Sequence, residues 1–231
     1  MSTDYATANG YVTPTTLTIS GIETLLLTDA AAGSVTTRSL DTGINKIILA
    51  VGDDTNAAAT FNFNAGASTL QIGLSTTTAA ALSNNGTATT VTVDAYGSAT
   101  DDSLIITNSK LRTADAYDDV AVTSTDFETV TINTGSYSTA IDQTIGAITV
   151  TGSTGATSAE TVKFTGANKI TVSGTITADI IDASGLTGGA ARGLVMSTAA
   201  TTVSSITGGA GNDTLYGGDG NDFLAGGAGA D

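Results

Sequence analysis

A nine-residue pattern repeated in tandem constrains the fold of this chain more than any other feature. The pattern is G-G-x-G-x-D-x-U-x, where U is apolar, and it fills 208–216 and then 217–225 without a gap. The first six positions of a third copy occupy 226–231. One Gly-Gly motif would carry little information, but two complete copies and two-thirds of another are a specific signal of a stacked repeat.

The residue types in each copy suit a hard cation. Calcium takes about six to eight oxygen ligands in a flexible cage. Glycines allow the backbone to turn through positive φ and to present its carbonyl oxygens inward, and the Asp at the sixth position adds carboxylate oxygen. The last three positions predict a short strand whose apolar residue, Leu215 or Leu224, points into the core. The alternative interpretation is a flexible glycine-rich tail.

The tandem pattern resembles the calcium-binding repeat of the RTX family. This resemblance implies a parallel β-roll in which two nonapeptides form one coil, so that each calcium ion lies between equivalent turns two nonapeptides apart. Asp222 is expected to form only half a site, because its upstream counterpart is Ser204. The residues expected to bind metal are Asp213 and Asp231, sharing one ion, with carbonyl oxygens near Gly209, Gly211, Gly227 and Gly229, together with Asn212 and Asp222.

Composition excludes several classes of function. The chain has 231 residues with no His and no Cys, so it offers no Ser-His-Asp or Cys-His nucleophile, no His-based zinc site and no disulfide. A formal net charge of −15, with only 7 basic residues, argues against nucleic acid as a partner. The apolar runs, such as 46–51, are too short to predict a membrane span, and the N-terminal residues do not resemble a cleavable secretory signal. We interpret the chain as a fragment of a longer protein.

Apolar residues alternate with Thr or Ser in many short segments. Segments of this kind lie at 17–20, 90–93, 130–133, 148–151 and 170–173. A period of two is typical of strands, and helix-forming residues are scarce, so at most a helical turn is expected around 76–83. The predicted fold class is all-β, with predominantly parallel, solenoid-like stacking that ends in an RTX β-roll. An antiparallel β-sandwich is the alternative for the N-terminal half.

We divide the chain into three parts on the strength of these patterns. An N-terminal Thr/Ala-rich β domain is expected over 1–120, a β-solenoid-like segment over 121–207, and truncated RTX repeats over 208–231. In a solenoid only neighbouring coils touch, and ladders of Thr, Asn and Gly suit such stacking.

A second recurring element places an acidic residue and a Thr ahead of an apolar run. It appears at 21–28, 126–132 and 159–165, and it contains all three Glu residues of the chain, Glu23, Glu128 and Glu160. Related segments at 44–49 and 167–172 have Asn-Lys in place of Glu-Thr. Each segment predicts a turn that leads into a strand, once per structural unit, and the unequal spacing indicates insertions. We expect these Glu side chains to be solvated or to cap turns rather than to act in catalysis.

Three pairs of adjacent aspartates are candidate sites for a hard cation outside the repeats. They are Asp53-Asp54, Asp101-Asp102 and Asp118-Asp119, although such pairs often only stabilise a turn. Because the excess of negative charge repels itself, bound divalent ions would stabilise the folded state. We therefore expect folding or assembly to depend on calcium, and a melting temperature that chelator leaves unchanged would contradict this.

Beyond the repeats, the chain resembles bacterial RTX-type surface-layer (S-layer) proteins such as that of Caulobacter. The resemblance rests on 19–24, on the other Glu-Thr-Val segments, and on 181–188 leading into 206–209. It implies secretion to the extracellular cell surface by a type I exporter and calcium-dependent contacts between copies of the chain. It also implies attachment to a cell-surface polysaccharide through a region not in this chain.

The expected function is therefore structural and non-catalytic, with Ca²⁺ as the cofactor. An RTX adhesin or biofilm matrix protein is the alternative, although the long, near-identical modules usual in adhesins are not seen. A secreted enzyme with a carboxylate-only or basic catalytic group is rejected. The close basic pair Lys110 and Arg112 has only Tyr117 as a nearby aromatic residue, whereas a polymer-binding groove normally needs several.

Overall fold

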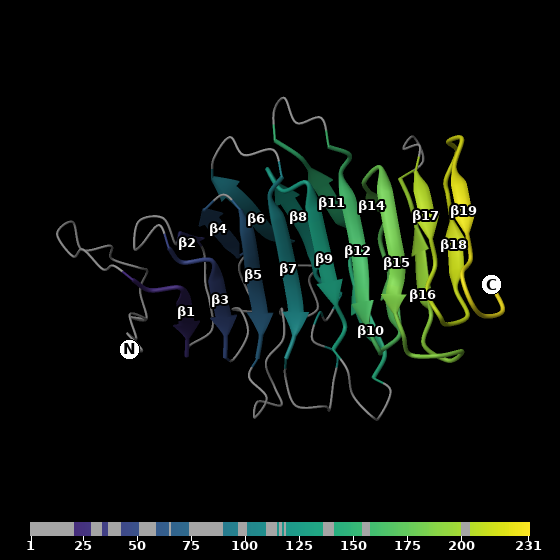
Figure 1. Cartoon of the computed structure of the whole chain (residues 1–231), viewed down its shortest axis with the longest axis horizontal. Helices are drawn as coiled ribbons and strands as arrows, with labels where there is room; N and C mark the ends of the chain where they lie inside the picture. Colours follow the sequence, from purple (N-terminus) through teal and green to yellow (C-terminus); the bar gives the residue numbers. More distant parts are fainter. Residues whose placement is uncertain are drawn as a thin grey trace.

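The chain winds into a β-solenoid whose coils stack along one axis (Figure 1). The computed structural model describes residues 21–28, 34–36, 43–50, 59–64, 66–73, 90–96, 101–109, 115, 117, 119–135, 141–153, 158–199 and 204–231. These residues contain no helix, and every strand pair among them is parallel. The predicted all-β parallel solenoid is confirmed. The antiparallel sandwich is wrong for the described strands of the N-terminal half.

One sheet runs the whole length of the described structure and is called the long sheet. Its 9 strands follow one another in chain order, from the N-terminal to the C-terminal end in Figure 1. They are β1 (Thr24–Leu27), β3 (Lys46–Leu49), β5 (Ala67–Ile72), β7 (Ser103–Asn108), β9 (Thr129–Asn133), β12 (Thr161–Gly166), β15 (Ile180–Leu186), β17 (Ser205–Thr207) and β19 (Phe223–Ala225).

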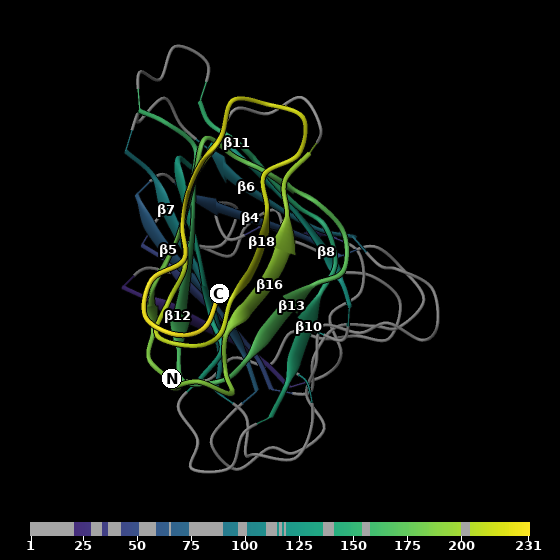
Figure 2. The ribbon, with the colours of Figure 1, turned by 90° about the vertical axis from the view of Figure 1, so that its right-hand side faces the viewer.

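Two shorter sheets complete the coils. The six-stranded sheet contains β2 (Ser34–Thr36), β4 (Thr60–Asn64), β6 (Thr90–Tyr96), β8 (Ala121–Thr125), β11 (Ile148–Thr151) and β14 (Ile176–Thr177). The four-stranded sheet contains β10 (Gln143–Ile145), β13 (Ile170–Val172), β16 (Leu194–Ser197) and β18 (Thr214–Tyr216). Figure 2, a view along the stack, shows the strands surrounding a shared interior.

Coil length varies in the body of the solenoid and becomes regular at the C-terminal end. Thr129 pairs with Thr161, and Thr161 in turn pairs with Ile180, so the second of these two coils is much the shorter. Ser205 pairs with Phe223, and this spacing along the chain equals the length of two nonapeptides. The expected coil of two nonapeptides is therefore present in the repeat region.

Alternation of inward and outward side chains produces the core. In β4 and β9, for example, every second residue is buried. An inward column of Leu104, Val130, Val162, Ile181 and Ile206 is fully buried. Burial of such side chains stabilises each coil by about 1.5–3 kcal/mol per residue. Tyr117 also belongs to this core, because it is fully buried and its hydroxyl donates to the Asn133 carbonyl at 2.6 Å.

Several local predictions can now be compared with the structure. The alternating segments at 130–133 and 148–151 are β9 and β11, and 170–172 is β13. The repeats at 208–231 are not a flexible tail, since β18 and β19 pair with β16 and β17. The helical turn expected at 76–83 lies outside the described residues. The long sheet runs through all three parts of the proposed domain division, which stays a prediction.

Candidate metal centre

The two turns that carry Asp213 and Asp231 stack directly on each other. The N–H of Asp213 donates to Oδ1 of Asp231 across 2.9 Å, between positions 18 residues apart. The N–H of Ala230 donates to Oδ1 of Asn212 across 3.0 Å, again at a spacing of 18 residues. The structure thus brings together the two aspartates that the sequence analysis paired.

Asp213 holds these turns in place through backbone hydrogen bonds. It is 4% exposed, and both of its carboxylate oxygens accept N–H groups. Oδ1 accepts from Leu194 in the preceding coil at 2.6 Å, and Oδ2 accepts from Gly209 in its own turn at 2.7 Å. Buried N–H groups need such partners, so this carboxylate stabilises both the turn and the coil beneath it. Asp231 is exposed by contrast.

Only glycine fits where these turns meet. A Cβ atom on Gly227 would overlap the carbonyl oxygen of Gly209, and one on Gly229 would overlap that of Gly211. Gly227 also has φ of +103°, a conformation that residues with a Cβ rarely adopt. The Gly209 and Gly211 carbonyl oxygens therefore face the next turn at very close range.

Asp222 occupies the equivalent position half a coil away. The N–H of Ser204 donates to Oδ1 of Asp222 at 2.8 Å and a spacing of 18 residues. Ser204 is buried, and its hydroxyl donates to the Ala178 carbonyl at 3.2 Å. Asp222 is therefore stacked on a serine, as the sequence analysis expected of a half site.

The donor atoms around the stacked turns fit calcium. They are carboxylate and carbonyl oxygens, which are the hard ligands that calcium prefers. Asp213, Asp231 and the nearby glycine carbonyls are the groups that would hold the ion. Among the described residues, no three or more acidic side chains converge as a metal site, so carbonyl oxygens are needed to complete the ligand shell. The individual ligands stay a prediction.

Comparison with protein families decides what these turns are. A family model described as the RTX calcium-binding nonapeptide repeat (4 copies) matches residues 205–231. These residues are an RTX calcium-binding repeat. The family binds calcium, so Ca²⁺ is the cofactor of this region, and such repeats are characteristic of secreted proteins. No curated protein and no solved structure matches the chain.

The RTX repeat continues a column of residues that begins far upstream. Residues that directly precede the strands of the long sheet from β7 to β19 lie at one register position, which we call the acid column. Its members are Asp102, Glu128, Glu160, Asp179, Ser204 and Asp222. Asp222 of the RTX repeat is therefore the structural equivalent of Glu128 in the acid-Thr segment.

Most side chains of the acid column make the same backbone contact. The carboxylate accepts the N–H of the residue at the equivalent position one coil earlier. The donor and acceptor pairs are Gly66 with Asp102, Asp102 with Glu128 (2.7 Å), Glu160 with Asp179 (3.2 Å) and Ser204 with Asp222 (2.8 Å). The sequence analysis treated the two motifs separately, although an acidic residue directly before a strand was the signal that could have joined them.

Glu128 is the most deeply engaged of the three glutamates. It is 3% exposed, and its second carboxylate oxygen accepts the N–H of Ser153 at 2.9 Å. Burial alone would raise the pKa of Glu128, but the N–H groups of Ser153 and Asp102 and the Ser153 hydroxyl hold this pKa below its ordinary value. Glu128 therefore caps a turn, which the sequence analysis expected, and it is not solvated.

Glu23 does not belong to the acid column. Through the pairing of β1, β3, β5, β7 and β9 it lies level with Val130, two positions beyond Glu128. Three other strands of the long sheet separate the coils of Glu23 and Glu128. The long stretch of chain between Glu23 and Glu128 therefore contains several coils and is not one unit with an insertion, which corrects the interpretation of the sequence. Further along the chain, the unequal coil lengths do agree with the expected insertions.

The structure describes only part of the three aspartate pairs that were candidate cation sites. Asp53, Asp54 and Asp118 lie outside the described residues, as do Lys110 and Arg112. Asp119 accepts a hydrogen bond from the Ser173 hydroxyl. Asp101 is exposed, whereas Asp102 is 1% exposed.

Proposed function

We propose that this chain belongs to a secreted structural protein of the S-layer type that assembles with copies of itself when calcium binds. An RTX repeat at the C-terminal end of one continuous parallel solenoid carries the proposal. Calcium binding between stacked turns would order the coils of the RTX repeat, on which contacts between copies of the chain would then depend.

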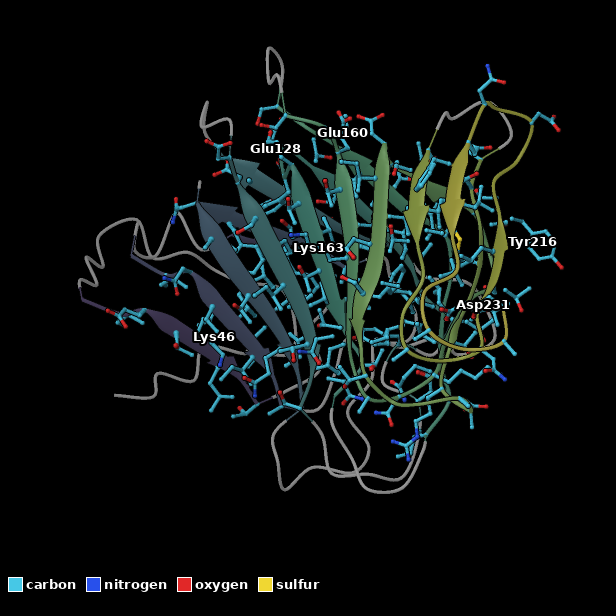
Figure 3. All side chains as sticks on the ribbon, turned by 45° about the vertical axis from the view of Figure 1, so that its right-hand side comes forward. Lys46, Glu128, Glu160, Lys163, Tyr216 and Asp231 are labelled. Atoms are coloured by element: carbon cyan, nitrogen blue, oxygen red, sulfur yellow. The ribbon has the colours of Figure 1, made fainter. Side chains whose placement is uncertain are left out.

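Large apolar side chains of the RTX coils are exposed in the described structure. Leu224 continues the inward column of Ile206 but is 45% exposed, and Phe223 is 64% exposed. Tyr216 in β18 is 62% exposed at the same end, where Figure 3 shows it with Asp231.

The chemistry of the described carboxylates supports a structural role rather than a catalytic one. Glu128 and Asp213 are buried and accept backbone N–H groups with both oxygens. Groups held in this way support the coils and are not free to transfer protons to a substrate. None of the described residues forms a helix that is long and apolar enough to cross a membrane.

Light scattering after size-exclusion chromatography, combined with electron microscopy, tests this proposal. The purified chain is compared in millimolar calcium and in excess chelator. We expect sheets or filaments in calcium that dissolve in chelator. A monomer that binds calcium without assembling would reject self-assembly and favour the adhesin alternative. No response to calcium would reject the function as a whole.

A further inference from the structure

The outward face of the long sheet holds two lysines at one register position. Parallel pairing aligns Lys46, Thr69, Ile105, Thr131 and Lys163 on neighbouring strands, from β3 to β12. Residues that flank them within these strands are buried, so this row points away from the core. We call these five residues the lysine row. The long sheet faces the viewer in Figure 1, and Figure 3 shows Lys46 and Lys163 on it.

This face is poor in acidic residues, unlike the rest of the described structure. Asp182, beside Lys163 in the register, is the only acidic residue within the 9 strands of the long sheet. The other described acidic residues, apart from Asp94 in β6, lie in the connections between strands. Neither Lys46 nor Lys163 forms an ion pair with a described residue. The face thus carries two lysines and one aspartate in a chain whose formal net charge is −15.

The lysine row is wide and has an apolar centre. Neighbouring strands lie about 4.8 Å apart, so the Cα atoms of Lys46 and Lys163 are separated by about 19 Å. Ile105 lies midway between them and is 41% exposed, and Ile180 on the same face is 38% exposed. An apolar centre with a charged group on each side suits a contact that excludes water in the middle and selects its partner by charge at the rim.

A complementary surface lies at the edge where strands of the long sheet begin. We call Asp101, Glu160 and Asp179 the acidic edge; Asp101 and Asp179 are exposed, and Figure 3 shows Glu160 at this edge. Asp101 accepts a hydrogen bond from the Ser158 hydroxyl at 3.4 Å, and Asp179 accepts the N–H of Glu160 at 3.2 Å. No described basic side chain forms an ion pair with these three carboxylates, so their charge is available to a partner.

We propose that the lysine row receives the acidic edge of a second copy of the chain. This inference rests on the proposed assembly and names the two surfaces that meet in it. The ammonium groups of Lys46 and Lys163 pair with carboxylates of the neighbouring copy, and Ile105 is covered between them. Exposed ion pairs contribute little free energy each, so their main effect is to select the orientation of the neighbour.

A face-to-face contact between two copies does not satisfy these charges. With Ile105 opposite Ile105, a two-fold axis places each lysine of one copy against a lysine of the other. Contact between the face of one copy and the edge of the next leaves every copy with a further surface to offer. Such a heterologous contact repeats from copy to copy, which an extended assembly requires.

Charge reversal on either surface, followed by mixing, tests the contact. Light scattering in millimolar calcium measures assembly of K46E/K163E, which makes the lysine row acidic, and of D101K/D179K, which makes the acidic edge basic. Each variant alone should lose assembly, because like charges then meet. An equimolar mixture should assemble as the parent does, because each variant supplies the surface that the other needs. Assembly of either variant alone, or a mixture that stays dispersed, would overturn the proposal.

Two further sets of variants control for net charge and for folding. K169E reverses a lysine outside the row that pairs with Asp142, and it should assemble like the parent; an equal loss would assign the effect to net charge and reject the contact. If a charge-reversed variant melts well below the parent, K46Q/K163Q and D101N/D179N take its place. They should raise the protein concentration needed for assembly on the order of tenfold, as expected for two lost exposed ion pairs, and an unchanged concentration would count against the contact.

The assembly and this contact fail in different ways. A parent chain that stays monomeric in calcium would reject the assembly and the contact with it. A parent that assembles no better than K46E/K163E would reject only the lysine row. Loss of assembly in K46E/K163E but not in D101K/D179K would show that the lysine row meets an acidic group other than the acidic edge, and the proposal would fail.

Discussion

At the residue scale, this solenoid is stabilised by carboxylates that accept hydrogen bonds from N–H groups of the preceding coil. Each coil corner exposes N–H groups that have no partner within their own strand, and a buried N–H without a partner is costly. Glu128 accepts the N–H of Asp102, and Asp213 accepts that of Leu194. The same kind of contact occurs in the acid-Thr segment and in the RTX repeat.

Replacing Glu128 by Gln tests this role. Gln retains one acceptor but places an NH₂ group against the N–H of Ser153 or Asp102. We expect E128Q to lower the free energy of unfolding by about 1–3 kcal/mol, measured by urea unfolding at neutral pH. E23Q is the matched control, because the exposed Glu23 begins the same motif, and its change should stay within about 0.5 kcal/mol. Similar losses in both variants would contradict the assigned contacts.

The stability that Glu128 contributes should depend on pH. Its pKa is lowered in the folded state from an ordinary value of 4.5. Because the unfolded chain then binds the proton more tightly, the contribution is present above pH 4.5 and is lost as the pH falls through the folded pKa. Urea unfolding of the parent and E128Q at a series of pH values should therefore show their difference shrinking below pH 4.5. A difference that grows in acid would be inconsistent with a lowered pKa.

At the scale of single turns, glycine decides whether neighbouring coils can approach. Gly227 and Gly189 both have positive φ, of +103° and +75°. A Cβ at Gly227 would overlap the Gly209 carbonyl, whereas a Cβ at Gly189 would meet nothing within 4 Å. The two positions share the backbone strain but differ in the contact between turns.

Alanine substitutions at these two glycines should separate strain from stacking. We expect G189A to cost about 1–2 kcal/mol, which is the penalty of a left-handed conformation. G227A should cost about 1–3 kcal/mol more because it forces the turns apart, and it should weaken calcium binding as well. Urea unfolding and calcium titration measure the two effects. Equal costs, with calcium binding intact in both variants, would mean that the turns do not depend on this close approach.

The whole molecule combines a body of variable coils with a regular calcium-binding end. Coil spacing falls to 18 residues in the RTX repeat, where the stacked turns bring Asp213 and Asp231 together. The body already has its own hydrogen-bonded corners and a continuous apolar core. Calcium bound in the RTX turns is therefore expected to stabilise mainly the C-terminal coils.

Substitution of Asp231 tests this expectation. Asn at position 231 keeps an acceptor for the N–H of Asp213 but removes the charge that attracts the ion. Calcium at about 100 times its dissociation constant should stabilise the parent by about 2.7 kcal/mol, and D231N should lose most of this gain. D219N is the control, because Asp219 is exposed and occupies a variable position of the repeat. If D219N and D231N respond alike to calcium in thermal unfolding, Asp231 is not a ligand.

The amino-acid sequence was sufficient for the fold class and for the calcium-binding repeat. Alternation of apolar residues with Thr or Ser indicates strands because side chains of a strand point to opposite faces. The spacing of Gly and Asp in 208–231 indicates stacked turns because tandem copies place the same residue types at a fixed interval, so equivalent turns of successive coils meet. These features can be read from the order and spacing of residues alone.

Only the tertiary structure decided which residues share a register position. Glu23 and Glu128 begin similar segments but lie two positions apart across the sheet, whereas Glu128 and Asp222 are equivalent despite their different motifs. The structure likewise buries Asp102 and leaves the adjacent Asp101 exposed. The physical reason is that hydrogen bonds between coils set the register, while connections of variable length absorb the difference in spacing along the chain.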